Sequence, residues 1–192
     1  MSVDSNKVST GKPAVGGAIS RAPLGTTLPT DATAALNSAF VSLGHVSEDG
    51  VTNSKSISTS DVKAWGGAIV YSTQTENTDK FKFKLIESRN ADVLKTIYGT
   101  NNVTVDNSGN IKVNVKPDDF EAFAWNIDML ISGGKKRIVI PNGKITELSD
   151  IVYKDDDVIG YEVTITAALV EGCYHHEYID LAGSSSGTSA TA

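Results

Sequence analysis

Cysteine is almost absent from this chain, and long apolar runs are missing altogether. The single Cys173 among 192 residues excludes a disulfide framework within the chain and is typical of a reducing compartment. No segment approaches the length of a transmembrane helix, and residues 1–7 are polar where a signal peptide needs an apolar core. We therefore expect a protein that is made and kept in the cytosol until cell lysis releases it.

Clusters of positive charge are scarce. The formal net charge is −6, the isoelectric point is near 5.0, and no long run of lysine or arginine interrupts the sequence. Proteins that grip nucleic acid concentrate positive charge to neutralise phosphates, so this composition argues against that class. A surface past which DNA slides would carry a negative potential instead, although ordinary solubility explains the same balance.

Catalytic motifs are missing as well. The chain has three histidines, no Gly-x-Ser-x-Gly motif, and glycine pairs without the Lys-Ser/Thr context of a phosphate loop. The alternative that favours an enzyme is a site around His175 and His176. We predict no catalytic residue and no cofactor, and hence a protein that is not an enzyme.

Side chains that bind metals gather in one short segment. On a strand Cys173, His175 and Glu177 share a face, but no second cluster supplies further ligands. Residues 155–157 are consecutive aspartates without the spaced ligands and glycine of a calcium loop. We interpret the first group as a polar strand face and the second as a solvated turn, and we predict no metal site.

What the chain does contain is a series of strand patterns. From Phe81 to Leu85 apolar residues alternate with lysines, as in a strand with one buried and one wet face. The preceding residues 68–75 are rich in β-branched and aromatic side chains, and residues 76–79 have the composition of a turn. The two segments are predicted to pair as a hairpin.

One good helix pattern follows this hairpin. Asn90 can cap its first amides, apolar residues recur at helical spacing as far as Tyr98, and Gly99 permits a left-handed stop. A helix of about ten residues is marginal alone. We therefore expect its apolar stripe to lie against the adjoining hairpin.

Further hairpins are predicted along the rest of the chain. Their predicted partners are residues 102–106 with 110–116, residues 121–131 with 135–140, and residues 150–153 with 158–168. Many short strands and one helix indicate a mainly β fold class, an antiparallel β-sandwich or barrel-like domain over residues 14–181 with one flanking α-helix.

Three polar segments differ from these strands. Residues 1–13 are predicted to be a flexible N-terminal arm, and residues 182–192 a low-complexity mobile tail. Residues 47–64 form a long polar loop, or equally an arm that becomes a hairpin when it docks on a neighbour. We interpret them as an inter-subunit loop, with the candidate contact residues Glu48, Asp49, Thr52, Asn53, Lys55, Ile57, Asp61 and Trp65.

A likeness to a known family begins in residues 9–32, which include Pro13-Ala14-Val15-Gly16-Gly17-Ala18-Ile19-Ser20-Arg21-Ala22-Pro23. It continues in residues 43–53, 63–67, 150–156, 160–162 and 164–167, and spans about residues 8–179. By these segments the chain resembles the major tail (tail tube) proteins of long flexible-tailed, siphovirus-type bacteriophages.

The resemblance implies a structural virion protein. Its subunits would form hexameric rings, which stack into a hollow tube that conducts genome DNA to the host. The inner sheets would join into a continuous barrel around the lumen, and the long loop with the terminal arms would tie one ring to the next. The implied partners are further copies of the chain, a tape-measure protein, and tail tip and tail terminator proteins. DNA would cross the lumen without specific binding, and no membrane is involved. The implied location is the virion, after assembly in the host bacterial cytoplasm.

Two other functions fit the same patterns. One is the tube subunit of a contractile tail or of a secretion device, which shares the ring architecture. The other is a monomeric virion protein whose β-sandwich binds carbohydrate or a surface.

Overall fold

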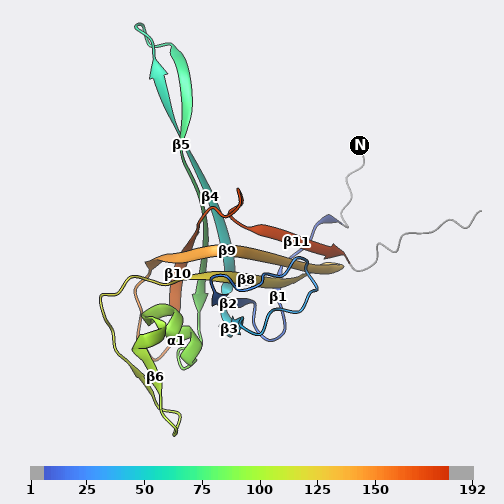
Figure 1. Ribbon diagram of the computed structural model, residues 1–192, viewed down its shortest axis with the longest axis vertical. Coiled ribbons are helices and arrows are strands. Elements are labelled where there is room, and N and C mark those ends of the chain that lie inside the picture. Colours follow the sequence, from blue (N-terminus) through green and yellow to red (C-terminus); the bar gives the residue numbers. More distant parts are fainter. Residues whose placement is uncertain (1–6, 182–192) are drawn as a thin grey trace, which may run out of the picture.

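Strands dominate the computed structural model, which describes residues 7–181 (Figure 1). The elements are β1 (Lys12–Pro13), β2 (Ile19–Pro23), β3 (Val41–Ser42), β4 (Val46–Lys63), β5 (Ile69–Leu85), α1 (Ala91–Tyr98), the 3₁₀ turn η2 (Thr100–Asn102), β6 (Val103–Val105), β7 (Ile111–Val113), β8 (Ala122–Ile131), β9 (Gly134–Leu148), β10 (Tyr161–Ala167) and β11 (His176–Leu181). The predicted mainly β, antiparallel fold is confirmed, with a single α-helix in this part of the chain.

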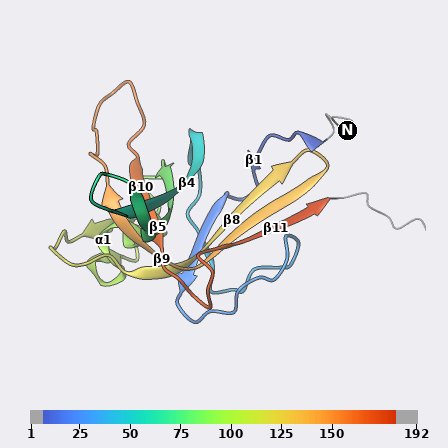
Figure 2. The same cartoon turned by 90° about the horizontal axis from the view of Figure 1, so that it is seen from above.

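Nine of the strands form one antiparallel sheet in the order β3-β2-β8-β9-β10-β5-β4, and β1 and β11 add to β8 and β9. Strand β9 changes partner along one edge, because its first half pairs with β11 and its second half with β10. Seen from above, the β8–β9 hairpin with β1 and β11 extends to one side, while β4, β5, β10 and α1 lie on the other (Figure 2). The arrangement is sandwich-like and does not close into a barrel within residues 7–181.

The core lies where β5, β8, β9 and β10 meet the helix. Phe81, Phe83 and Leu85 are buried as their alternation predicts. They pack in one cluster with Trp125, Ile127, Ile140, Ile145, Val163, Ile165 and the helix residues Val93, Leu94 and Ile97. Trp125 Nε1 donates to the Gly143 carbonyl at 2.8 Å, and a Cβ on Gly143 would come within 2.9 Å of the indole ring. The close approach of β9 to this tryptophan therefore requires glycine.

Helix α1 begins and ends as its sequence predicts. The Asn90 side chain accepts from the Asp92 amide at 2.9 Å, and Gly99 ends the helix with a φ of 92°. The Asn90 side chain also donates to Glu87 at 3.0 Å. The apolar stripe joins the same core cluster as β5, so the short helix is stabilised by tertiary packing.

Two predicted hairpins are wrong. Residues 76–79 are not a turn, because β5 runs unbroken from Ile69 to Leu85 and pairs with β4 along its length. Of the two alternatives predicted for residues 47–64, the loop is wrong, because residues 46–63 are β4. The hairpin is observed, and β4 forms it with β5 of the same chain. Serine- and threonine-rich segments are compatible with strands, and the long β4–β5 pairing overrides the local turn composition. Residues 150–153 form no strand, and β10 pairs with β9 and β5 instead.

The other local signals correspond to observed elements. Residues 102–106 and 110–116 contain the β6–β7 hairpin, and residues 121–140 contain the β8–β9 hairpin. Two residues of the predicted N-terminal arm, Lys12 and Pro13, pair with β8 as β1. The tail predicted at 182–192 lies outside the described residues.

Replacing the helix cap tests the local origin of α1. Asn90→Ala removes the side-chain acceptor at the first turn, and we expect the free energy of unfolding to fall by about 1 kcal/mol. Urea denaturation followed by circular dichroism measures this difference. Asn90→Ser keeps a capping oxygen and is expected to retain most of the stability. An alanine variant as stable as the unmodified chain would contradict the capping role.

Candidate intersubunit interface

The β4–β5 hairpin extends far beyond the core. Between residues 54 and 77 every side chain except Ser58 is exposed, and we call this segment the distal hairpin. Figure 1 shows it rising away from the rest of the molecule, with α1 at the opposite end. It closes in a tight turn in which the Ala64 amide donates to the Ala68 carbonyl at 2.8 Å. Gly66 and Gly67 take φ values of 103° and 91°, which side chains with a Cβ rarely adopt.

The end of the distal hairpin is apolar. We define the hairpin tip as residues 62–71, whose Lys63 is their one charged side chain. Its exposed apolar residues are Val62, Trp65, Ile69, Val70 and Tyr71. Trp65 is 106% exposed, and Val62 pairs across the strands with Tyr71. Exposed apolar residues gathered in one segment in this way make the tip a candidate site of interaction with another molecule.

The eight candidate contact residues are distributed along this hairpin, and all are exposed. Glu48, Asp49, Thr52 and Asn53 lie at its base, Lys55, Ile57 and Asp61 along the distal hairpin, and Trp65 at its tip. Their contact with a second subunit stays a prediction. Val62, Ile69, Val70 and Tyr71 are also exposed but are not among the predicted contact residues. The signal for the last three is the unbroken apolar run at residues 68–71 beside a glycine pair, although its composition predicts only a strand paired with residues 81–85.

A buried polar network fixes the base of the distal hairpin. Asp79 is only 2% exposed and lies where β5 enters the core. Asn53 Nδ2 donates to Asp79 Oδ1 at 2.6 Å, and His175 Nδ1 forms a hydrogen bond with Asp79 Oδ2. The Tyr174 hydroxyl donates to the Asn77 carbonyl at 2.6 Å. The segment before β11 therefore holds β5 at the point where it leaves the core, and Asn53 joins β4 to the same carboxylate.

The same network involves the predicted polar face of residues 173–177. His175 packs its ring edge-on against Phe81, with a centroid distance of 5.2 Å, and its Nε2 lies 3.8 Å from Glu177. No group of three metal-binding side chains with suitable geometry occurs in residues 7–181. His175 serves in this structure as a hydrogen-bond partner of a buried carboxylate.

One face of the sheet carries a ladder of ion pairs. Lys80, Lys82 and Lys84 project from β5 opposite the core, and their ammonium groups lie 3.6, 2.8 and 3.9 Å from Glu147, Glu162 and Asp157. The hydrogen bond from Lys82 lowers the pKa of the Glu162 carboxyl, with a further contribution from the Ser149 hydroxyl. The same bond raises the pKa of Lys82. The lysine row is therefore neutralised within the chain.

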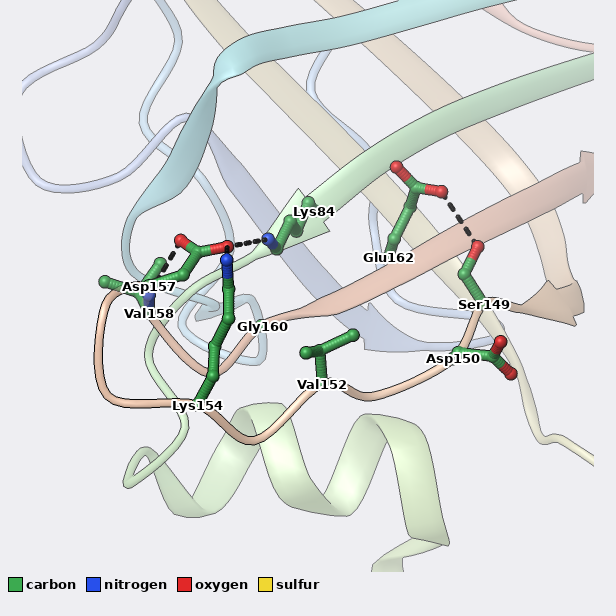
Figure 3. Close-up of a pocket in the computed structure, with 9 residues that line it drawn as sticks. All are labelled: Lys84, Ser149, Asp150, Val152, Lys154, Asp157, Val158, Gly160 and Glu162. Carbon is green, nitrogen blue, oxygen red and sulfur yellow. Dashed lines mark hydrogen bonds and ion pairs between the residues drawn. The ribbon is translucent and has the colours of Figure 1, made fainter.

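A shallow hollow lies at the end of this ladder, beside the loop between β9 and β10. It has a volume of about 360 Å³ and is lined by Lys84, Ser149, Asp150, Val152, Lys154, Asp157, Val158, Gly160 and Glu162 (Figure 3). Helix α1 runs beneath the loop in this view. Tyr98 and Tyr161 meet edge-to-face at 6.2 Å, and burial, with the nearby Tyr98 and Tyr153, raises the pKa of Tyr161 to about 12. The tyrosine hydroxyl therefore stays protonated at neutral pH.

Several sheet edges are open within residues 7–181. Strands β3 and β4 end the sheet order, and β11 pairs only with β9. Open edges present unpaired amides and carbonyls to which another chain can add a strand. No described helix is long and apolar enough to cross a membrane.

An exposed apolar hairpin on a β-sandwich with open edges is typical of a structural subunit that assembles with other chains. Comparison with known families is in accord, because the model of the phage tail tube protein family matches residues 1–182. The chain therefore belongs to the phage tail tube protein family, a family of structural virion components. No curated protein matches the sequence.

Loosening the base of the distal hairpin tests the polar network. In His175→Ala, Asp79 loses a hydrogen-bond partner. For a buried group this loss lowers the free energy of unfolding by about 1–3 kcal/mol. We expect the hairpin to vary more in direction while the sheet stays folded. Spin labels at Ser60→Cys and Lys112→Cys, in a Cys173→Ser background, report the distance distribution between hairpin and core.

The distribution is expected to broaden in His175→Ala. Glu76→Gln is the control, because it changes an exposed charge on the same hairpin without touching Asp79, and it should leave the distribution narrow. Equal widths in all three proteins would show that the network does not set the direction of the hairpin.

Proposed function

We propose that this chain is the tube subunit of a long, flexible, non-contractile phage tail. Six copies form a ring, and rings stack into a hollow tube that conducts genome DNA to the host. The observation that carries this proposal is the family match over residues 1–182, joined to a hairpin whose apolar tip has no cover within the described chain. The protein acts through self-assembly and not through chemistry.

Ring formation uses the open sheet edges. An edge strand gains hydrogen bonds when a neighbouring copy pairs with it, so β4 and β11 are surfaces on which sheets of adjacent subunits join. In a ring of this kind, one surface of each subunit contacts a different surface of the next subunit. Such head-to-tail contacts close into a ring when the rotation between neighbouring subunits divides a full turn evenly. Edges at different places in the sheet order meet this requirement.

Stacking of rings uses the distal hairpin. Its base is held by the Asp79 network, and its tip displays Trp65 and Tyr71 to solvent. Burial of such side chains contributes about 1.5–3 kcal/mol each. Contact with a subunit of the adjacent ring therefore stabilises the stack and also covers the apolar tip.

The sheet face with the lysine ladder is the face that we assign to the lumen. It lies opposite the core, and its three lysines are matched by carboxylates. The chain as a whole carries a net charge of −6. A neutral to negative wall attracts no phosphates, so DNA passes without being held.

The remaining partners follow from the same role. A tape-measure protein occupies the lumen during assembly, tip and terminator proteins cap the tube ends, and assembly takes place in the host bacterial cytoplasm. The type of tail is the open alternative, because membership of the phage tail tube protein family does not distinguish a flexible tail from a contractile one. A sheath around the tube in purified particles would favour a contractile tail instead. A stable monomer whose melting temperature rises with a sugar ligand would favour a binding protein.

Shortening the distal hairpin separates folding from stacking. Replacing residues 59–75 with Asn-Gly keeps the Asp79 network and the paired base of β4 and β5, and supplies a favoured two-residue turn. We expect a folded subunit that no longer forms tubes, because the apolar tip is missing. Light scattering and negative-stain electron microscopy over a concentration series measure assembly.

The matched control is Ser60→Ala, which changes the same segment without removing the tip and should assemble like the unmodified chain. Tubes of normal length from the shortened chain would contradict the stacking role. Failure of the unmodified chain to form rings or tubes, both alone and with a purified tail tip complex, would contradict the tube function itself.

A further inference from the structure

The hairpin tip and the loop between β9 and β10 lie at opposite ends of one strand. Strand β5 begins at Ile69 in the tip and ends at Leu85, and Lys84 lines the hollow beside that loop. A strand of 17 residues spans roughly 55 Å at about 3.3 Å per residue. The tip of a chain therefore cannot reach its own loop.

The loop carries apolar groups that no other part of residues 7–181 covers. We call residues 150–158 the acidic loop. Val152, Tyr153 and Val158 in it are 56%, 70% and 55% exposed. Val152 and Val158 also line the hollow of about 360 Å³, which is at the small end of the 300–1,000 Å³ that ligand pockets occupy. A hollow of this size suits one large side chain.

The acidic loop also carries surplus negative charge. It contains four aspartates and one lysine, so its formal charge is −3. Lys154 pairs with Asp156 and Asp157, and Lys84 with Asp157. Asp150 and Asp155 make no ion pair with residues 7–181. A partner that brings one positive charge with apolar side chains is complementary to this surface.

The hairpin tip has those properties. Lys63 gives it a formal charge of +1, in a chain whose net charge is −6, and Trp65 is the largest of its exposed apolar side chains. Because the two surfaces differ and lie at opposite ends of β5, a contact between them is head-to-tail. Repeated contacts of that kind build a stack and not a closed pair.

We propose that the hairpin tip of one copy docks on the acidic loop of a second copy, with Trp65 in the hollow and Lys63 facing Asp155. This inference rests on the proposed tube function and names the surface on the adjacent ring that receives the hairpin. It assigns to Val152, Tyr153 and Val158 a role that their exposure in the single chain leaves open.

Chemical cross-linking tests the contact directly. Ala64→Cys in the tip and Val158→Cys in the acidic loop, in a Cys173→Ser background, are treated with a short bismaleimide in assembled tubes. All three residues are exposed, so the fold should tolerate the changes, and circular dichroism checks this. Because each copy carries both thiols, we expect a ladder of covalent multimers on denaturing gels.

The matched control moves the second thiol to Val105, another exposed apolar residue at the helix end of the molecule. Ala64→Cys with Val105→Cys should give no ladder. A ladder from the Val105 pair and none from the Val158 pair, in tubes of normal appearance, would overturn the inference and leave the tube function standing. Absence of tubes from the unmodified chain would overturn both.

Charge reversal tests the electrostatic part independently. Lys63→Glu and Asp155→Lys should each weaken tube growth, by roughly two- to fivefold per contact for exposed pairs, and the double variant should recover it. Lys112→Glu, which reverses an exposed charge on β7 outside the distal hairpin, is the control and should have no such effect. Equal losses in Lys63→Glu and Lys112→Glu, without recovery in the double variant, would contradict the pairing with Asp155.

Discussion

The continuous pairing of β4 with β5 is the interaction on which the rest of this structure depends. One end of β5 places Phe81, Phe83 and Leu85 in the core, and the other end carries Ile69, Val70 and Tyr71 into solvent. A two-stranded ribbon is marginally stable by itself. The distal hairpin therefore depends on the core for its own order, and the buried Asp79 with its partners marks the boundary between the two parts. The same strand thus links the stability of the subunit to the surface that we propose for stacking.

This arrangement divides the apolar residues of the chain into two groups. One group is buried by the fold itself, around Trp125 and the stripe of α1. The other lies exposed at the hairpin tip and on the acidic loop, at opposite ends of β5. Exposed apolar surface favours association, and two different surfaces favour open-ended association. A tube built from identical subunits needs both the rigid core and such unequal ends.

Local signals in the sequence predicted the fold where the structure is determined locally. Asn90 and Gly99 bound the helix as predicted, and the hairpin predicted from residues 121–131 and 135–140 is β8–β9, with Gly133 in its turn at a φ of 76°. Caps and tight turns depend on neighbouring residues. The turn predicted at residues 76–79 is wrong because these residues belong to β5, where Asp79 forms a hydrogen bond with His175, a residue distant in sequence. The apolar run at residues 69–71 was predicted correctly as a strand, but its exposure to solvent was not predicted. A sequence shows that such residues need cover, but not whether the cover comes from the same chain or from another copy. The candidate contact residues therefore included Ile57 and Trp65 and missed their apolar neighbours.

The central claim is that the distal hairpin of one subunit crosses to a subunit of the next ring. A helical reconstruction of the assembled tube by electron cryomicroscopy tests it most directly, because it resolves which copy each hairpin touches. The account predicts density for residues 54–77 that leaves its own ring and ends against the adjacent one, with the sheet face of Lys80, Lys82 and Lys84 toward the lumen. Hairpins that fold back on their own ring, or that point freely outward while rings still stack, would contradict it.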